Sequence, residues 1–320
     1  MIRLSFCIEL KYEIAGQPAD FVFNIHAART PCQGVVVECL DLAPALAHDV
    51  QADPDLGNRY LRVRAGPGPL VVRYQATVDI DPRLDSPALL DEVPIAALAP
   101  HVLPFIYPSR YCQSDRLRRL AAREFGHLRT GYGRVQAIHD WVRARTAFVP
   151  GSSNSSTSAT DTLVEQAGVC RDFAHLMIAL CRACNIPARF VTAIDYGAAA
   201  VLGPTDFHAF VEVFLRDRWY SFDPTGITAP MGLVRIGTGR DAADVSFATI
   251  FGSVASQAPV ISICARDDPA GGFPLPHHTP QALSTSGTPG AVEMPMQGAG
   301  YGPGVLGERT PSLGAACARE

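Results

Sequence analysis

Three residue types that together carry out acyl transfer occur along this chain in the order Cys170, His208 and Asp223. A cysteine thiolate can attack a carbonyl carbon, and a histidine can take up and return the proton. A carboxylate behind the imidazole holds it in one tautomer and one orientation. The chain has nine cysteines. Residue type alone therefore does not identify a catalytic site, and the sequence around each of the three residues has to be considered.

Cys170 is predicted to lie in the first turn of a helix. In the segment QAGVCRDFAHLMIALCRACNIP, Gly168 ends a short preceding helix, and apolar residues at helical spacing follow the cysteine. Asn185 can take the left-handed capping conformation, and Pro187 prevents continuation. The unpaired N–H groups of a first turn stabilise a thiolate and an oxyanion. Position alone is equally compatible with an ordinary buried cysteine, so the downstream residues matter.

His208 and Asp223 are predicted to lie on one face of a β-hairpin. The segment DFHAFVEVFLRDRWYSFDPTG alternates with strand period, turns at Arg216–Arg218 and returns to Asp223, where Pro224 stops it. With a two-residue turn, directly opposed residues share a face and have numbers whose sum is odd. Asp223 then falls on the face of His208, at the open end. Alone, the histidine could be a surface strand residue and the aspartate a turn cap. Their joint placement favours a catalytic pair.

The blocks GVCRDFAHL, DFHAFVEV and RWYSFDPT resemble the three catalytic blocks of the transglutaminase-like superfamily, over roughly residues 110–250. The N-terminal β region and the segments PSRYC-QSD, PGSS and GTGRDAADV are similar to its bacterial branch, often described as candidate cysteine proteases. The resemblance implies an α+β, papain-like core in which the cysteine helix packs on an antiparallel sheet. It also implies that Cys170 is the nucleophile, His208 the base and Asp223 the orienting carboxylate.

The remaining sequence divides into parts of different composition. Residues 1–90 predict an all-β domain, because β-rich runs such as GVVVECL and LVVRYQATVDI alternate with turn segments. Residues 91–113 are a Pro-rich connector, and residues 114–264 are expected to form the catalytic domain. Residues 265–320 are rich in Pro, Gly and small residues and lack apolar periodicity, so we expect a disordered tail.

Five further residues are candidates for substrate binding. Ser152 and Ser153 lie in the polar loop PGSSNSSTSAT, which leads into the cysteine segment, and Phe207 precedes the predicted base. Arg240 and Asp241 lie in LVRIGTGRDAADV, which contains a Gly-x-Gly-x-x-Ala pattern. As a dinucleotide fingerprint this is weak, because no further Rossmann strand with an acidic residue follows. A loop that borders the catalytic groove is the favoured interpretation.

The composition limits the partners and the compartment. The formal net charge is −4 with no basic block, so we expect no nucleic-acid partner. The N-terminus lacks the apolar core of a signal peptide and no apolar run of roughly 18 residues occurs, so we expect a cytoplasmic protein without a membrane partner. Cys181 and Cys184 lack the second pair of a zinc ribbon and the helix-start position of a thioredoxin motif. Neither a metal nor a cofactor is expected.

The leading hypothesis is a cysteine-dependent peptidase or amidase that cleaves a peptide or isopeptide amide of a peptide or protein substrate through an acyl-enzyme. The first alternative is an amine acyltransferase, a true transglutaminase, which shares the first half-reaction. The second is a non-catalytic protein-binding module on the same scaffold, against which the intact triad argues. The third is a redox-sensing cysteine, which would not need the histidine and the aspartate.

Overall fold

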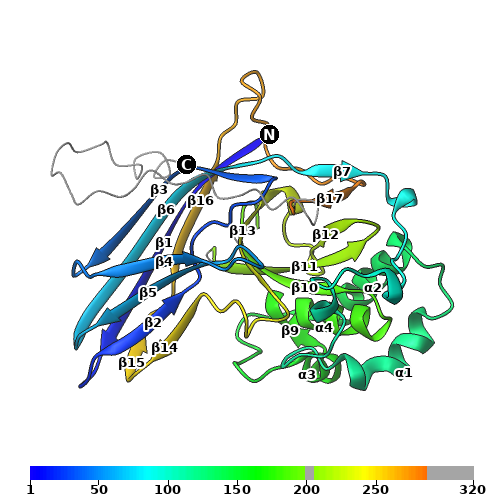
Figure 1. Cartoon of the computed structure of the whole chain (residues 1–320), viewed down its shortest axis with the longest axis horizontal. Helices are drawn as coiled ribbons and strands as arrows, with labels where there is room; N and C mark the ends of the chain where they lie inside the picture. The colour runs from blue at the N-terminus through cyan, green and yellow to red at the C-terminus, as the bar shows by residue number, and fades with distance from the viewer. Residues whose placement is uncertain (199–204, 287–320) are drawn as a thin grey trace.

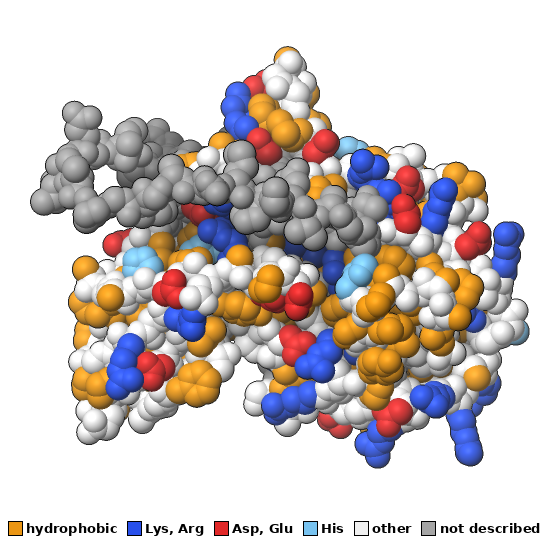
Figure 2. Space-filling view, in the orientation of Figure 1, with side chains coloured by type: hydrophobic (Ala, Val, Ile, Leu, Met, Phe, Trp, Pro, Cys, Tyr) orange, Lys and Arg blue, Asp and Glu red, His pale blue; other side chains and the backbone are white. Residues whose placement is uncertain are grey.

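The computed structural model describes residues 1–198 and 205–286. Figure 1 shows two parts side by side: a strand-rich part, and a mixed part that contains the helices α1 to α4. On the face drawn in Figure 2, Lys and Arg side chains are spread over both parts, among acidic and apolar ones. Among the described residues, no helix is long and apolar enough to cross a membrane.

The strand-rich part consists of two antiparallel sheets. The first contains β3 (Gln33–Ala43), β6 (Gly68–Ile80) and β1 (Ile2–Ile14), with β15 (Val254–Ser256) and β16 (Val260–Ala265) both paired to β1. The second has the order β14 (Ala248–Phe251), β2 (Ala19–Phe23), β5 (Arg59–Ala65) and β4 (His48–Ala52). Alternate residues of β1 are buried, as expected of a strand between a core and solvent. The predicted N-terminal β domain is confirmed.

The C-terminal boundary predicted for the catalytic domain, residue 264, is wrong. Strand β14 pairs with β2, and β16 pairs with β1 from Leu4↔Ala265 to Glu9↔Val260. Residues 248–265 therefore belong to the β domain. The physical reason is that β1 and β2 each need a hydrogen-bonded neighbour on both sides, and these late strands supply the second one.

The predicted disordered tail, residues 265–320, is wrong in its first part. Strand β17 (Ala282–Ser284) pairs with β7 (Arg83–Asp85), and all three residues of β17 are buried. Leu283 packs into the core of the β domain. This segment is ordered by strand pairing and polar contacts. The prediction from the sequence relied on apolar periodicity, which does not detect such contacts. Residues 287–320 of the prediction lie outside the described residues.

The connector predicted at residues 91–113 consists of short turns that pack onto the mixed part. It contains the 3-10 helices η2 (Ile95–Ala97) and η3 (Leu103–Phe105), preceded by η1 (Pro87–Leu89). Phe105 lies edge-on to Trp219, with ring centroids 5.2 Å apart. The connector thereby covers the turn end of the predicted hairpin.

The mixed part is built around one buried helix on one antiparallel sheet. The sheet has the order β12 (Arg218–Phe222), β11 (Phe207–Leu215), β10 (Ala188–Asp195) and β13 (Leu233–Gly239), and η5 (Pro230–Gly232) precedes β13. The helices are α1 (Ser114–Phe125), α2 (Tyr132–Arg145), α3 (Ala159–Glu165) and α4 (Cys170–Ala183), and the short strands β8 (Ala147–Phe148) and β9 (Ala167–Gly168) pair in parallel. Helix α4 packs on β10 and β11 and is surrounded by the other helices. The predicted α+β core, with the cysteine helix on an antiparallel sheet, is confirmed.

The β domain and the mixed part have separate cores, but some side chains of the mixed part's sheet pack into the core of the β domain. Ile194 of β10, together with Val234 and Ile236 of β13, belongs to the apolar cluster that fills the β domain. Asn58 of the β domain also exchanges two hydrogen bonds with the backbone of Thr238. The strands that carry the candidate site are therefore fixed on the β domain as well as on α4.

Substitutions at two leucines test whether the segment at residues 275–283 is packed. Leu283→Ala should lower the free energy of unfolding by about 2–5 kcal/mol, because the side chain is 3% exposed and its removal leaves a cavity. Leu275→Ala, in the same segment but 39% exposed, should change it by less than about 0.5 kcal/mol. Urea denaturation of both variants measures the difference. Equal, negligible effects would show that this segment is not packed.

Candidate active site

Cys170 is the first residue of α4, where the sequence predicts it. The residue before it, Val169, has extended backbone angles, and its N–H donates to Asp172 Oδ2 at 2.8 Å. This bond caps the helix start. A Cβ on Gly168 would lie 2.6 Å from Asp172 Cβ, so only glycine leaves room for the cap. The Cys170 thiol is partly exposed, and its Sγ lies 3.8 Å from the carbonyl oxygen of Phe207.

His208 and Asp223 are brought together by the predicted hairpin. The register of β11 and β12 runs from Leu215↔Arg218 to Val211↔Phe222, which leaves a two-residue turn and opposed numbers whose sum is odd. His208 Nε2 lies 3.1 Å from Asp223 Oδ2. Both residues are buried, with 3% and 4% of their surfaces exposed. Because Asp223 takes Nε2, Nδ1 is the ring nitrogen left to exchange a proton with a thiol.

The electrostatics of this pair oppose the effect of burial. Burial favours the neutral imidazole, but the charge and hydrogen bond of Asp223, and the hydrogen bond and charge of Cys170, outweigh it and raise the pKa of His208 well above its usual range. Burial likewise acts to raise the pKa of Asp223, yet His208 and Thr225 together lower it below its usual range. The imidazole held in this way is also in contact with the Cys170 thiol.

Two residues that the sequence did not single out hold Asp223 in place, one at its carboxylate and one at its backbone carbonyl. Asp223 Oδ1 accepts hydrogen bonds from the backbone N–H of Thr225 at 3.0 Å and from its hydroxyl at 2.7 Å. The carbonyl oxygen of Asp223 lies 2.8 Å from His139 Nε2 of α2. The Asp-Pro-Thr sequence was a usable signal for the first contact. The second joins two elements far apart in the chain, and nothing local indicates it.

A second carboxylate, Asp195, lies on the other side of the imidazole. Its Oδ2 is 3.7 Å from His208 Nδ1, and the residue is 6% exposed. Asp195 ends β10, two residues beyond Ala193, which is paired with His208. Burial raises the pKa of Asp195, the His208 charge opposes this, and the charges of Asp223 and Asp206 add to the rise. Both nitrogens of the imidazole thus face a carboxylate.

The two predicted serines lie near the start of α4. Ser153 Oγ accepts a hydrogen bond from Arg171 Nη2 at 3.2 Å, so the serine loop contacts the residue that follows Cys170. Ser152 Oγ donates to the carbonyl of Val149 at 2.7 Å. Both serines are partly exposed. Their role in substrate binding stays a prediction.

Phe207 contributes to the site through both its backbone and its ring. Its carbonyl oxygen faces the Cys170 sulfur, and its ring stacks on Phe247 with centroids 4.5 Å apart. Phe247 packs against the core of the β domain. Phe207 is partly buried, and its side chain connects the β domain to the neighbourhood of the nucleophile.

Arg240 and Asp241 are placed differently from the predicted substrate loop. Asp241 is 2% exposed, and its carboxylate accepts the backbone N–H groups of Tyr111 and Ala243, both at 2.9 Å. Its bonds are internal, so the prediction of substrate contact is wrong for Asp241. Arg240 is exposed and pairs with Asp244, so its predicted contact lacks support.

The glycines of this segment are explained by close packing, and they do not form a dinucleotide-binding site. A Cβ on Gly237 would lie 2.3 Å from the side-chain nitrogen of Asn24, and a Cβ on Gly239 would lie 2.6 Å from Asp244 Cβ. Both glycines belong to β13, an edge strand of an antiparallel sheet. A Rossmann fingerprint requires a parallel βαβ unit.

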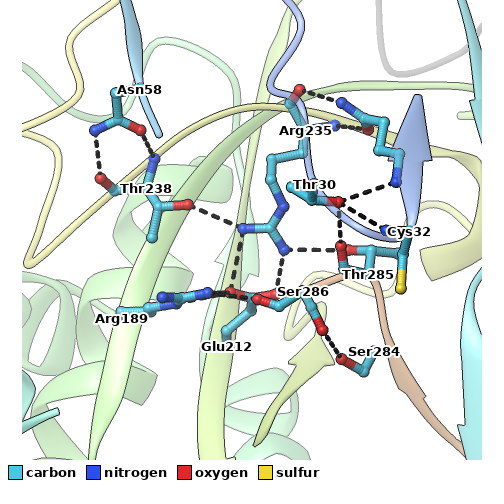
Figure 3. A network of polar contacts seen from close by, with 11 residues as sticks. Thr30, Cys32, Asn58, Arg189, Glu212, Arg235, Thr238, Ser284, Thr285 and Ser286 are labelled. Atoms are coloured by element: carbon cyan, nitrogen blue, oxygen red, sulfur yellow. Dashed lines mark hydrogen bonds and ion pairs between the residues drawn. The ribbon is translucent and has the colours of Figure 1, made fainter. Parts of the chain in front are cut away.

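A buried ionic network lies on the same face of β11 as His208 and is centred on Glu212. Figure 3 shows Glu212 between Arg189 and Arg235. Burial acts to raise the pKa of Glu212, but the two guanidinium groups lower it below its usual range. Arg189 Nη2 also donates to Ser286 Oγ at 2.7 Å, and Arg235 Nη2 to Thr285 Oγ1 at 3.1 Å. The segment after β17 is thereby tied to the catalytic sheet.

Two family models match the chain. The transglutaminase-like superfamily matches residues 118–224, which include all three residues of the candidate triad. The N-terminal domain of bacterial transglutaminases matches residues 3–101, which include most of the predicted N-terminal β domain, residues 1–90. The two matches follow one another along the chain in the order that the fold shows.

Similar proteins agree with these matches. A crystal structure of a candidate cysteine protease from Cytophaga hutchinsonii is 38% identical, with a TM-score of 0.82, over 88% of this chain and 97% of that one. An uncharacterised protein of Mycobacterium leprae is 32% identical over 117 residues, and one of Mycobacterium tuberculosis is 29% identical over 143. The matches cover 42% and 46% of these two proteins, so the chain spans less than half of their length. The site and the comparisons support a cysteine-dependent enzyme, and the chain belongs to the transglutaminase-like superfamily.

Proposed function

We propose that this protein is a cysteine-dependent peptidase or amidase that cleaves a peptide or isopeptide amide through an acyl-enzyme. The observation that carries the proposal is the arrangement of the Cys170 thiol, at the first turn of α4, against a buried His208 that is bonded to Asp223. A partly exposed sulfur can reach a substrate, while its base and the carboxylate are shielded from water.

In the proposed reaction the Cys170 thiolate attacks the carbonyl carbon of the amide and forms a tetrahedral oxyanion. The carbon–nitrogen bond then breaks as His208 Nδ1 gives its proton to the leaving nitrogen, and a thioester remains on the sulfur. A water molecule, deprotonated by His208, attacks the thioester and releases a carboxylic acid. The thiol is regenerated.

The first turn of α4 suits the oxyanion of this reaction. The backbone N–H groups of Cys170 and Arg171 belong to the first turn, whose donors have no partner within the helix. They also carry the positive end of the helix dipole. We expect them to bind the oxyanion, an effect worth about 3–4 kcal/mol per donor in characterised acyl-transfer enzymes.

A second candidate function, transfer of the acyl group to an amine, is favoured by one observation. Asp195 lies 3.7 Å from His208 Nδ1, where the nitrogen of a leaving or an incoming amine has to approach. A carboxylate at this point can accept a hydrogen bond from that amine. Both candidates share the acyl-enzyme, and they differ in whether water or an amine resolves it. A peptide or protein substrate, the lack of nucleic-acid and membrane partners and a cytoplasmic location stay predictions from the sequence.

Trapping the acyl-enzyme tests both candidates. Incubation with a peptide library, followed by mass spectrometry, should give an acyl adduct on the peptide that contains Cys170. With methylamine present, a hydrolase still yields the free acid, and a transferase yields the methylamide. Cys170→Ala should abolish turnover, whereas Cys184→Ala, at the other end of α4, should keep it. An adduct elsewhere, or equal loss in both variants, would refute the assignment.

The thiol chemistry can be tested without a substrate. Cys170 should react with iodoacetamide near neutral pH at least tenfold faster than Cys184, because an imidazolium lies against it while burial raises the pKa of the Cys184 thiol. Rates come from mass spectrometry of timed, digested samples. Equal rates for the two thiols would contradict a thiolate–imidazolium pair.

The role of Asp195 predicts a change in the pH profile. Asp195→Asn removes a negative charge near His208 Nδ1 and so lowers the pKa of His208. His208 is charged below its pKa and neutral above it, and acyl-enzyme formation needs its proton for the leaving nitrogen, so the basic limb of the pH profile of acyl-enzyme formation should move to lower pH, with a several-fold slower rate on that limb. Asp217→Asn, at the exposed turn of the hairpin, is the matched control and should leave the profile unchanged. A basic limb that stays in place in Asp195→Asn would rule out this role.

A further inference from the structure

A cavity of about 220 Å³ borders the aspartate of the candidate triad. Its walls come from α2, the end of β12, the turn at residues 226–230 and the segment at 278–283. Asp223 lines it, but Cys170 and His208 do not. It is therefore distinct from the place where the acyl group is expected to bind.

Arg143 of α2 lines this cavity with a guanidinium group that has no acidic partner among the described residues. Its Cζ lies against Gly226, where an added Cβ would be 2.5 Å away, and Gly226 has a φ of +63°. Only glycine leaves room for the guanidinium there. Arg134 of the same helix, by contrast, is paired with Glu92. An unpaired exposed arginine alone would be ordinary, so the neighbouring groups of the cavity matter.

Ser221 of β12 supplies an independent observation. The residue is 7% exposed, and its Oγ has no hydrogen-bond partner among the described residues. A buried hydroxyl without a partner costs free energy, and an ion or a water molecule is the usual explanation. Ser221 lines the same cavity as Arg143.

The charges of the lining select the kind of ligand. His278 adds a ring that can donate a hydrogen bond, whereas both ring nitrogens of His139 are engaged, Nε2 by the Asp223 carbonyl and Nδ1 by Asp140. The acidic residue of the lining, Asp223, has its carboxylate oxygens occupied by His208 and Thr225. Asp140 contacts His139 Nδ1 but does not line the cavity. The lining therefore offers donors and positive charge without a free carboxylate, which fits an anion better than a cation.

We propose that this cavity binds a small oxyanion, a carboxylate or a phosphate, between Arg143 and Ser221. The guanidinium gives two parallel N–H donors, which match the geometry of both anions, and the Ser221 hydroxyl gives a third. The volume suits a ligand of a few non-hydrogen atoms, since pockets for drug-sized molecules begin at about 300 Å³. His139 also holds the carbonyl of Asp223 at 2.8 Å, so the anion lies next to the group that positions the triad.

Calorimetric titration of the full chain tests the proposal and needs no turnover, so its result is independent of the proposed function. Inorganic phosphate and succinate are titrated separately at constant ionic strength, with chloride as the balancing salt, because screening alone mimics weak anion effects. We expect saturable binding of at least one anion at one site per chain. The arm that binds tells a phosphate from a carboxylate ligand.

Variants identify the site. Arg143→Gln and Ser221→Ala should each weaken the bound anion about tenfold or more, as loss of a charge-assisted contact does. Arg145→Gln is the matched control, because this arginine lies on the same helix, stacks on Trp141 and does not line the cavity. Near-ultraviolet circular dichroism checks that each variant is folded. No saturable binding of either anion, or equal weakening by Arg145→Gln, would overturn the proposal.

Discussion

The buried contact between His208 and Asp223 is the interaction on which the rest of the site depends. A charge inside a protein is costly unless a partner and hydrogen bonds offset the loss of water. Burial opposes the charged form of both residues, and their mutual attraction, helped by Cys170 for His208 and by Thr225 for Asp223, reverses it. The distance of 3.1 Å between them therefore has to be kept. The hairpin register sets it, Thr225 holds the carboxylate of Asp223, and His139 holds its backbone carbonyl.

The β domain and the segment after β17 both hold the sheet that contains this contact. Strands β10 and β13 extend into the core of the β domain, and Phe207 packs against that core beside the nucleophile. Behind β11, Glu212 is neutralised by Arg189 and Arg235, which in turn bind the segment after β17. A half-paired charge at this depth would be strongly destabilising. Residues 285 and 286 are therefore bound to the sheet that carries the candidate triad.

The features that can be predicted from the sequence are those that depend on neighbouring residues along the chain. The start of α4 at Cys170 follows from the glycine, the apolar spacing and the helix stop, and the shared face of His208 and Asp223 follows from hairpin parity. Asp195 and His139 could not be identified in this way, because they reach the site from other elements. Strand β16 was missed for the same reason, since its partner β1 lies at the opposite end of the chain. The prediction for Asp241 was wrong because its carboxylate accepts a hydrogen bond from the backbone N–H of Tyr111, a residue far away in the sequence.

The presence of two carboxylates on one imidazole has a physical explanation in the proposed reaction. Before the attack, the His208 imidazolium has three negative neighbours: Asp223 at Nε2, and the thiolate and Asp195 on the other side. Once the sulfur bonds to the carbonyl carbon in the tetrahedral oxyanion, the thiolate charge is gone, and without Asp195 the buried imidazolium would have one charged partner and would lose its proton more readily. Asp195, 3.7 Å from Nδ1, remains on that side through both half-reactions. It can therefore keep the proton on His208 until the leaving nitrogen takes it, a task that Asp223, on the far nitrogen, cannot perform alone.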